Sequence, residues 1–108
     1  MARFLVERYV RGDVRQIAAE VERRSREATD ALTAEGIAVA YLGSMVLPDD
    51  AACFCLYEAD SALDVERAND RAGLSYLRIT RALVDGRTPD LAGSHPAPPV
   101  AEASEVER

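Results

Sequence analysis

Residues 37–59 read IAVAYLGSMVLPDDAACFCLYEA, and they give the clearest indication of the fold. Its two halves, residues 37–47 and 51–59, are rich in the β-branched and aromatic residues that are typical of strands. Between them stands Pro48-Asp49-Asp50, which favours a turn because proline fixes φ and aspartate hydrogen-bonds to its own backbone. The stretch therefore predicts a β-hairpin.

Helical patterns flank this hairpin on both sides. Residues 14–35 carry apolar side chains at helical spacing, with Asp13 as the expected N-cap and Gly36 at the C-terminal end. Residues 62–72 repeat the pattern over a shorter length, and Gly73 closes it. The hairpin therefore lies between two predicted helices.

Two further strands, residues 3–10 and 76–84, complete a β-α-β-β-α-β order. This order predicts an α+β, ferredoxin-like fold, in which the four-stranded antiparallel sheet has the order 4-1-3-2 and both helices cover one face. We expect residues 1–86 to form this domain. Residues 87–108 hold four of the five prolines among Ala, Ser and Glu, which predicts a disordered tail.

Both faces of the predicted sheet are apolar. In the third strand, alternation places Cys53, Cys55 and Tyr57 on one face and Phe54 and Leu56 on the other. In the second strand, alternation predicts a face made of Val39, Tyr41 and Met45 and an opposite face made of Ala40, Leu42 and Val46. One layer of helices covers only one face. We therefore expect a homodimer through the open sheet face.

The charge balance excludes two classes of partner. The chain has 13 basic and 19 acidic residues, a net charge of −6, and all of its basic residues are Arg. An acidic protein has no bulk attraction for nucleic acid or for an anionic membrane. No apolar run approaches the ~18 residues of a membrane span, and the N-terminus lacks a signal-peptide pattern. We expect a cytoplasmic protein with reduced cysteines.

Few residues suggest metal or catalytic chemistry. Cys53 and Cys55 share a strand face and resemble half of a metal site, but zinc needs four ligands, so we interpret them as buried apolar residues. One exception stays open, because a dimer axis near the third strand would bring four thiolates together. The only histidine, His95, lies in the expected tail, which argues against histidine-dependent catalysis. We expect no cofactor and no tightly bound metal.

Three residues are candidate ligand contacts. Glu7 is a carboxylate in an otherwise apolar strand, which makes it a candidate. The alternative is that Glu7 lies at the rim of the sheet and pairs with an arginine, and the same alternative applies to Glu58. Asn69 lies on the apolar side of the second helix, where it either faces a pocket or hydrogen-bonds to the backbone. Tyr41 is the third candidate. We expect no catalytic residues among them.

Four short motifs occur in order along the chain: Phe4-Leu5-Val6-Glu7-Arg8, Tyr41-Leu42-Gly43-Ser44, Phe54-Cys55-Leu56-Tyr57-Glu58-Ala59 and Ala72-Gly73. Together they resemble a family of small, largely uncharacterised ferredoxin-like bacterial proteins. The resemblance spans about residues 3–84, and one branch of the family is described as nickel-binding and dimeric. It implies a ferredoxin-like homodimer.

The resemblance does not carry nickel binding to this chain. The nickel-binding branch depends on histidines near the first strand and in the second helix. At those places this sequence has Glu7, Arg8, Tyr9, Ala68 and Asn69. Nickel favours imidazole nitrogen, so we expect no tight Ni(II) site.

Three functions remain open at this point. The leading hypothesis is a non-catalytic dimeric module that holds a small ligand, or a metal weakly, in a cleft between sheet and partner. The alternative is a dimeric α/β-barrel enzyme, similar to small isomerases or cofactor-free monooxygenases, that uses Glu7, Tyr41 and Asn69. The third is an adaptor whose dimer surface is its whole function. A ligand-sized cavity favours the first two, and a filled core favours the third.

Overall fold

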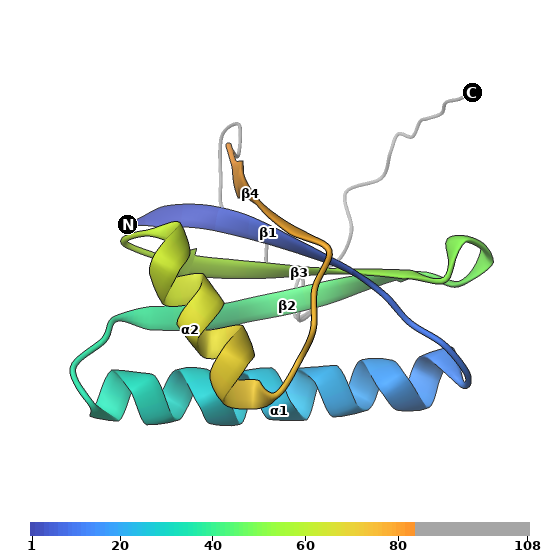
Figure 1. The fold of residues 1–108 in the computed structure, drawn as a ribbon, viewed down its shortest axis with the longest axis horizontal. Helices are drawn as coiled ribbons and strands as arrows, with labels where there is room; N and C mark the ends of the chain where they lie inside the picture. The colour runs from blue at the N-terminus through green and yellow to red at the C-terminus, as the bar shows by residue number, and fades with distance from the viewer. Residues whose placement is uncertain (84–108) are drawn as a thin grey trace, which may run out of the picture.

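A computed structural model of the chain describes residues 1–83. Four strands, two α-helices and one short 3₁₀ turn follow each other along this part of the chain (Figure 1). In order they are β1 (Ala2–Tyr9), α1 (Val14–Ala34), β2 (Val39–Leu47), η1 (Pro48–Asp50), β3 (Ala52–Ala59), α2 (Ala62–Ala72) and β4 (Arg78–Ala82). The expected tail and the proposed domain end at residue 86 lie outside the described residues.

The sheet confirms the predicted topology. Its order is β2-β3-β1-β4, every neighbouring pair is antiparallel, and both helices lie on the same side of it (Figure 1). The strand bounds differ slightly from the sequence prediction. The amide of Ile37 still donates to the carbonyl of Leu32 over 2.9 Å, so residues 37 and 38 belong to the turn after α1. At the other end, β4 covers residues 78–82 and not 76–84.

Helix ends follow their caps. The Asp13 carboxylate accepts from the backbone amides of Arg15 and Gln16, which satisfies two of the free donors at the start of α1. Gly73 ends α2 with φ of 69°, a left-handed conformation that glycine adopts without a Cβ penalty. The helices bury apolar side chains against the sheet, and this core includes Phe4, Val6, Val21, Leu32, Tyr57 and Val65.

A β-bulge corrects the predicted alternation of β2. Tyr41 pairs with Tyr57, but Gly43 already pairs with Leu56, so one extra residue stands in β2. Gly43 has φ of 142°, which favours glycine. Beyond the bulge the faces exchange, so the prediction that Met45 shares a face with Tyr41 was wrong. Ser44 and Val46 turn toward the helices, and Met45 turns to the open face.

The face away from the helices carries apolar side chains in the middle and ion pairs at its sides. Leu5 pairs with Leu56 across β1 and β3, and Tyr9, Met45 and Leu47 are exposed there at 65%, 48% and 36%. The flanking ion pairs are Arg3–Glu58 at 3.0 Å and Glu7–Arg78 at 3.1 Å. Among residues 1–83, no helix or strand packs over this face.

Neither helix in this part of the chain is long and apolar enough to cross a bilayer.

Candidate functional site

A cluster of buried polar side chains lies between the sheet and the helices. This buried cluster consists of Arg8, Ser25, Tyr57 and Asn69. Arg8 on β1 donates through Nη2 to Asn69 Oδ1 on α2 over 2.8 Å, and through Nη1 to the carbonyl of Ser75 over 2.9 Å. The Tyr57 hydroxyl lies 3.5 Å from the same Asn69 oxygen and 2.9 Å from Ser25 Oγ on α1. These contacts join both helices to the two central strands.

Arg8 has an unusual environment for a charged residue. It is only 4% exposed, its Nε is buried without a hydrogen-bond partner, and both acceptors of its Nη atoms are neutral. Within residues 1–83, no carboxylate forms an ion pair with it. Desolvating an unpaired charge is costly, so the site favours a negative group close to this guanidinium.

Two thiols lie beside it. Arg8 is the direct cross-strand partner of Cys53, and Cys53 Sγ lies 3.9 Å from Cys55 Sγ. A hydrogen bond from Cys53 lowers the pKa of Cys55 against the effect of burial, and the charge of Arg8 lowers it further. Cys53 keeps its proton, since this hydrogen bond and burial raise its pKa. Arg8 thus favours a thiolate at Cys55.

A hydroxyl pair links these thiols to the seam between α1 and β2. Ser44 Oγ lies 3.1 Å from Cys55 Sγ, and the Tyr41 hydroxyl forms a short contact with Ser44 Oγ. Ser44 reaches this position because the bulge at Gly43 turns it toward the helices. Burial raises the pKa of the Tyr41 hydroxyl, which therefore stays protonated at neutral pH.

Two clefts open along this seam, and Tyr41 lines both. One has a volume of about 280 Å³ and is lined by Ala18, Ala19, Glu22, Tyr41, Gly43, Ser44 and Val46. The other has about 290 Å³ and is lined by Arg26, Thr29, Asp30, Thr33, Val39, Ala40 and Tyr41. Arg26 also stacks over the Tyr41 ring at 5.1 Å. The lining of the first cleft includes Ser44, whose hydroxyl contacts Cys55, and Tyr41, whose hydroxyl contacts Ser44.

The three residues predicted from the sequence do not form one site. Tyr41 and Asn69 lie on the helix-covered side, whereas Glu7 lies on the open face and pairs with Arg78. Glu7 and Glu58 are both paired with arginines, as the alternative interpretation of these carboxylates predicted. Asn69 makes the predicted backbone bond to the carbonyl of Val65 and in addition accepts from Arg8.

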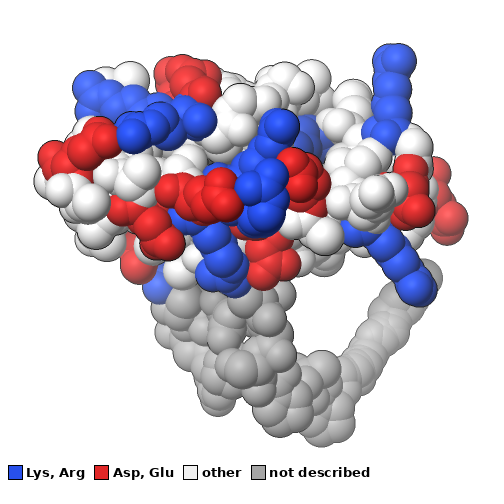
Figure 2. Space-filling view, turned by 90° about the horizontal axis from the view of Figure 1, so that it is seen from below, with Lys and Arg blue, Asp and Glu red and all other residues white. Residues whose placement is uncertain are grey.

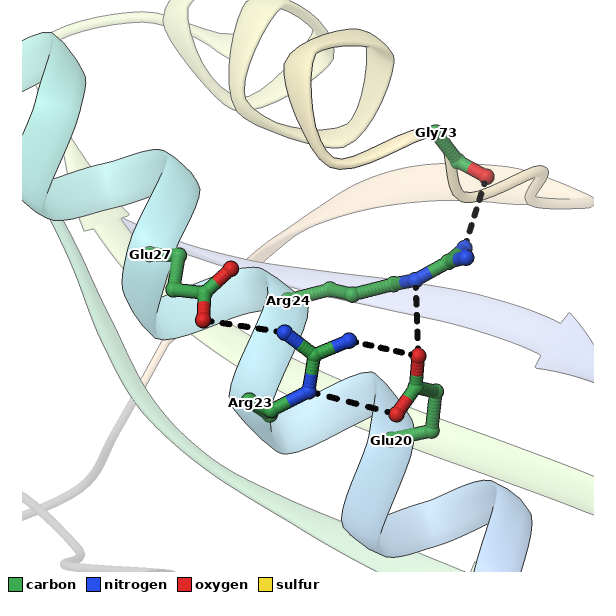
Figure 3. Close-up of polar contacts among 5 residues, drawn as sticks. All are labelled: Glu20, Arg23, Arg24, Glu27 and Gly73. Carbon is green, nitrogen blue, oxygen red and sulfur yellow. Dashed lines mark hydrogen bonds and ion pairs between the residues drawn. The ribbon is translucent and has the colours of Figure 1, made fainter.

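The neighbouring basic residues of α1, Arg23, Arg24 and Arg26, lie on a solvated surface. Basic and acidic side chains alternate on the α1 side of the molecule (Figure 2). Figure 3 shows Arg23 between Glu20 and Glu27, and Arg24 joining Glu20 to the carbonyl of Gly73. A cleft of about 330 Å³ lies between α1 and α2 at this point. Its arginines are already paired with carboxylates, so it offers little to a charged ligand.

The cysteines cannot meet across the open face. Both side chains point toward the helices, and both residues are 0% exposed. The four-thiolate site between subunits, left open by the sequence, is therefore excluded for a dimer formed through that face. Within residues 1–83, the structure brings no three His, Cys, Asp or Glu side chains together as a metal cluster.

The sequence did not reveal two residues of the buried cluster. Arg8 lies in a strand whose side chains alternate between two faces, and an arginine in such a strand usually faces solvent. The only indication that Arg8 faces the helices is that the alternation places it on the same face as Phe4 and Val6. Ser25 interrupts the apolar stripe of α1 and is 1% exposed. A polar residue at an apolar position was the available signal for both.

Comparison with known proteins identifies relatives of this fold. A family model described as "Nickel responsive protein SCO4226-like" matches residues 4–81. A solved structure, titled "Crystal structure analysis of SCO4226 from Streptomyces coelicolor A3(2)", aligns with a TM-score of 0.58 and 21% identity. The alignment covers 79% of this chain and 100% of that chain. No protein in the curated set matches.

Proposed function

Because the chain belongs to the family described as nickel responsive protein SCO4226-like, we propose that it is a homodimeric ligand-binding member of that family. Its ligand is a small molecule held in the cleft between α1 and β2 that contains Ser44. We place the protein in the cytoplasm as part of this proposal, because a reducing compartment keeps Cys53 and Cys55 as thiols.

One observation carries the proposal of ligand binding. The cleft of about 280 Å³ has walls of alanine and valine, and Tyr41 and Ser44 bring two hydroxyls to it. An apolar pocket with a few convergent polar groups is the usual form of a small-molecule site. The hydroxyls supply donors and acceptors, and Glu22 lies at the same cleft. Tyr41 is then a ligand contact, whereas Asn69 is hydrogen-bonded to Arg8 and does not line this cleft.

The open sheet face supports the dimer. Its exposed Tyr9, Met45 and Leu47 lie in adjoining rows of the sheet, and ion pairs flank its apolar centre. A second copy would cover the same side chains with their own counterparts, as a two-fold interface requires. Glu7 belongs to this face and would lie at the interface.

Tight nickel binding is not part of the proposal. Nickel sites in proteins favour imidazole, and the single histidine, His95, lies outside the described residues. Glu7, at one of the places where the nickel-binding branch has histidines, is already paired with Arg78. We expect Ni(II) to bind more weakly than micromolar at neutral pH, as measured by titration calorimetry on reduced protein without a tag.

Native mass spectrometry of protein taken from its own source tests the ligand site. We expect a co-purified small molecule in the wild type, less of it in Tyr41→Phe, and wild-type occupancy in Tyr76→Phe. The control removes a tyrosine hydroxyl away from the cleft. Equal occupancy in both variants would exclude the Tyr41 cleft as the ligand site.

A further inference from the structure

The charge of the cleft that contains Ser44 comes from one side chain. Of the residues that line this cleft, only Glu22 is charged. Its Oε2 atom accepts one hydrogen bond, from Arg26 Nε over 3.2 Å. Within residues 1–83, no group donates a hydrogen bond to the other carboxylate oxygen, Glu22 Oε1. The cleft therefore has a carboxylate oxygen that is available to a ligand.

Arg26 shows which charge is favourable beside this cleft. Its guanidinium bonds to Glu22 and lies over the Tyr41 ring at 5.1 Å, which is a cation–π contact. Arg26 lines the neighbouring cleft and is not part of the lining of the cleft with Ser44. Its single exposed bond to Glu22 is weak, unlike those of Arg23, whose three guanidinium nitrogens all bond to carboxylates. Glu22 and Tyr41 therefore attract a cation, and Arg26 leaves the first cleft open to another.

Hydrogen bonds inside the protein use the protons of both hydroxyls in the cleft. Arg8 favours a thiolate at Cys55, and a thiolate only accepts hydrogen bonds. Ser44 Oγ, 3.1 Å from Cys55 Sγ, then donates to this sulfur and accepts from the Tyr41 hydroxyl. The Tyr41 oxygen keeps its lone pairs, so it offers an acceptor to a ligand.

We propose that the cleft with Ser44 binds a small organic ammonium ion. Its charged group contacts Glu22 and the Tyr41 hydroxyl. Its apolar body lies against the apolar part of the lining, which is Ala18, Ala19 and Val46. An ammonium group has three donors and no acceptor, which matches a carboxylate and a hydroxyl oxygen that both accept. This inference rests on the proposed function, because it names the chemical class of the ligand for the same cleft.

The test uses three probes of similar size and different charge: benzylammonium, benzyl alcohol and benzoate. Each is titrated into the reduced, isotope-labelled, full-length protein, and NMR follows the amide signals of Gly43 and Ser44, which line the cleft. We expect benzylammonium to bind about 10-fold more tightly than benzyl alcohol, because hydrogen bonds to charged groups are stronger than neutral ones. Benzoate should not bind, because Glu22 repels it.

A pair of matched variants tests the role of the carboxylate. Glu22→Gln should weaken benzylammonium binding about 10-fold, to the level of benzyl alcohol. Glu27→Gln is the control, because Glu27 is also an exposed carboxylate of α1 paired with an arginine, but it does not line this cleft. It should bind benzylammonium like the wild type. Both positions are exposed on the helix, so both variants should fold, and circular dichroism checks this.

Four results would overturn the preference for a cation: no binding of benzylammonium, equal binding of benzylammonium and benzyl alcohol, binding of benzoate, or full benzylammonium affinity in Glu22→Gln. Failure of the proposed function has a different readout, which is the occupancy of the co-purified molecule in Tyr41→Phe. If benzyl alcohol or benzoate shifts Gly43 and Ser44 as strongly as benzylammonium does, the cleft stays a ligand site and only its cation preference is wrong.

Discussion

The Nη2 atom of Arg8 lies 2.8 Å from Asn69 Oδ1, so the side chain of a central strand is held by the second helix inside the core. Asn69 is 0% exposed and also donates to the carbonyl of Val65, which fixes its orientation. The pair therefore links the strand that carries the buried charge to the helix that covers it.

Replacing Asn69 should reveal how the charge of Arg8 is accommodated. Asn69→Leu removes the acceptor and should lower the free energy of unfolding by about 2–3 kcal/mol, because a buried charged donor is left without its partner. Asn69→Asp keeps an acceptor and adds a negative charge, so it should cost less. Urea denaturation measures both. An equal loss in the two variants would contradict the importance of this hydrogen bond.

Tyr57 should make the protein less stable in alkali. Burial raises the pKa of Tyr57 to about 12, above the value of about 10 for an unfolded tyrosine. The unfolded state then loses its proton first, so the stability from this group is complete below pH 10 and is lost as pH rises toward 12.

Urea unfolding at pH 9, 10 and 11 tests this dependence. The wild type should lose stability above pH 10 more steeply than Tyr57→Phe, by up to about 1.4 kcal/mol per pH unit. At pH 8 the variant should be less stable by about 1 kcal/mol, because the contact with Ser25 is lost. Equal losses of stability with pH in the wild type and in Tyr57→Phe would contradict the prediction, because Tyr57 would then have the same pKa in the folded and unfolded states.

Gly43 should be intolerant of any side chain. Its φ of 142° is a conformation that other residues rarely adopt, and it forms the bulge that turns Ser44 toward Cys55. Gly43→Ala should lower the free energy of unfolding by about 1–3 kcal/mol. An unchanged or increased stability, measured by urea denaturation, would mean that β2 can pair without the bulge.

A charge placed on the open sheet face should disrupt the proposed dimer. Met45 is 48% exposed on this face, and Leu63 is 51% exposed on α2. Replacing either residue with glutamate therefore places no charge in a packed core. Light scattering should show a dimer for the wild type and for Leu63→Glu, and a monomer for Met45→Glu. A dimer in all three proteins would place the interface elsewhere.

Local patterns in the sequence predicted most of the fold. The turn at residues 48–50, the Asp13 cap and the glycine after α2 each act over a few residues, so their positions identify the elements and their order. The exchange of faces in β2 was not predicted, because Leu42-Gly43 contains no residue that by itself demands a bulge. Only the pairing with β3 shows which residue is extra.

The buried cluster was harder to predict than the fold. Tyr41 and Asn69 were identified, but Arg8 appeared only within a strand motif and Ser25 only as a weak point in the helical stripe. Their burial depends on contacts between residues far apart in the sequence, such as Ser25 with Tyr57. Glu7 was assigned to the ligand site because one strand alone does not show which face the helices cover.

The number of small molecules bound to the proposed dimer is the decisive measurement. The proposed cleft is lined by residues of α1 and β2 on the helix-covered side of each chain, away from the face that would join the two copies. A native mass spectrum of protein from its own source should therefore show a dimer with up to two small molecules, one for each chain. A dimer that holds a single ligand would place the site between the sheets, near Glu7, and a monomer or a consistently empty dimer would contradict the account.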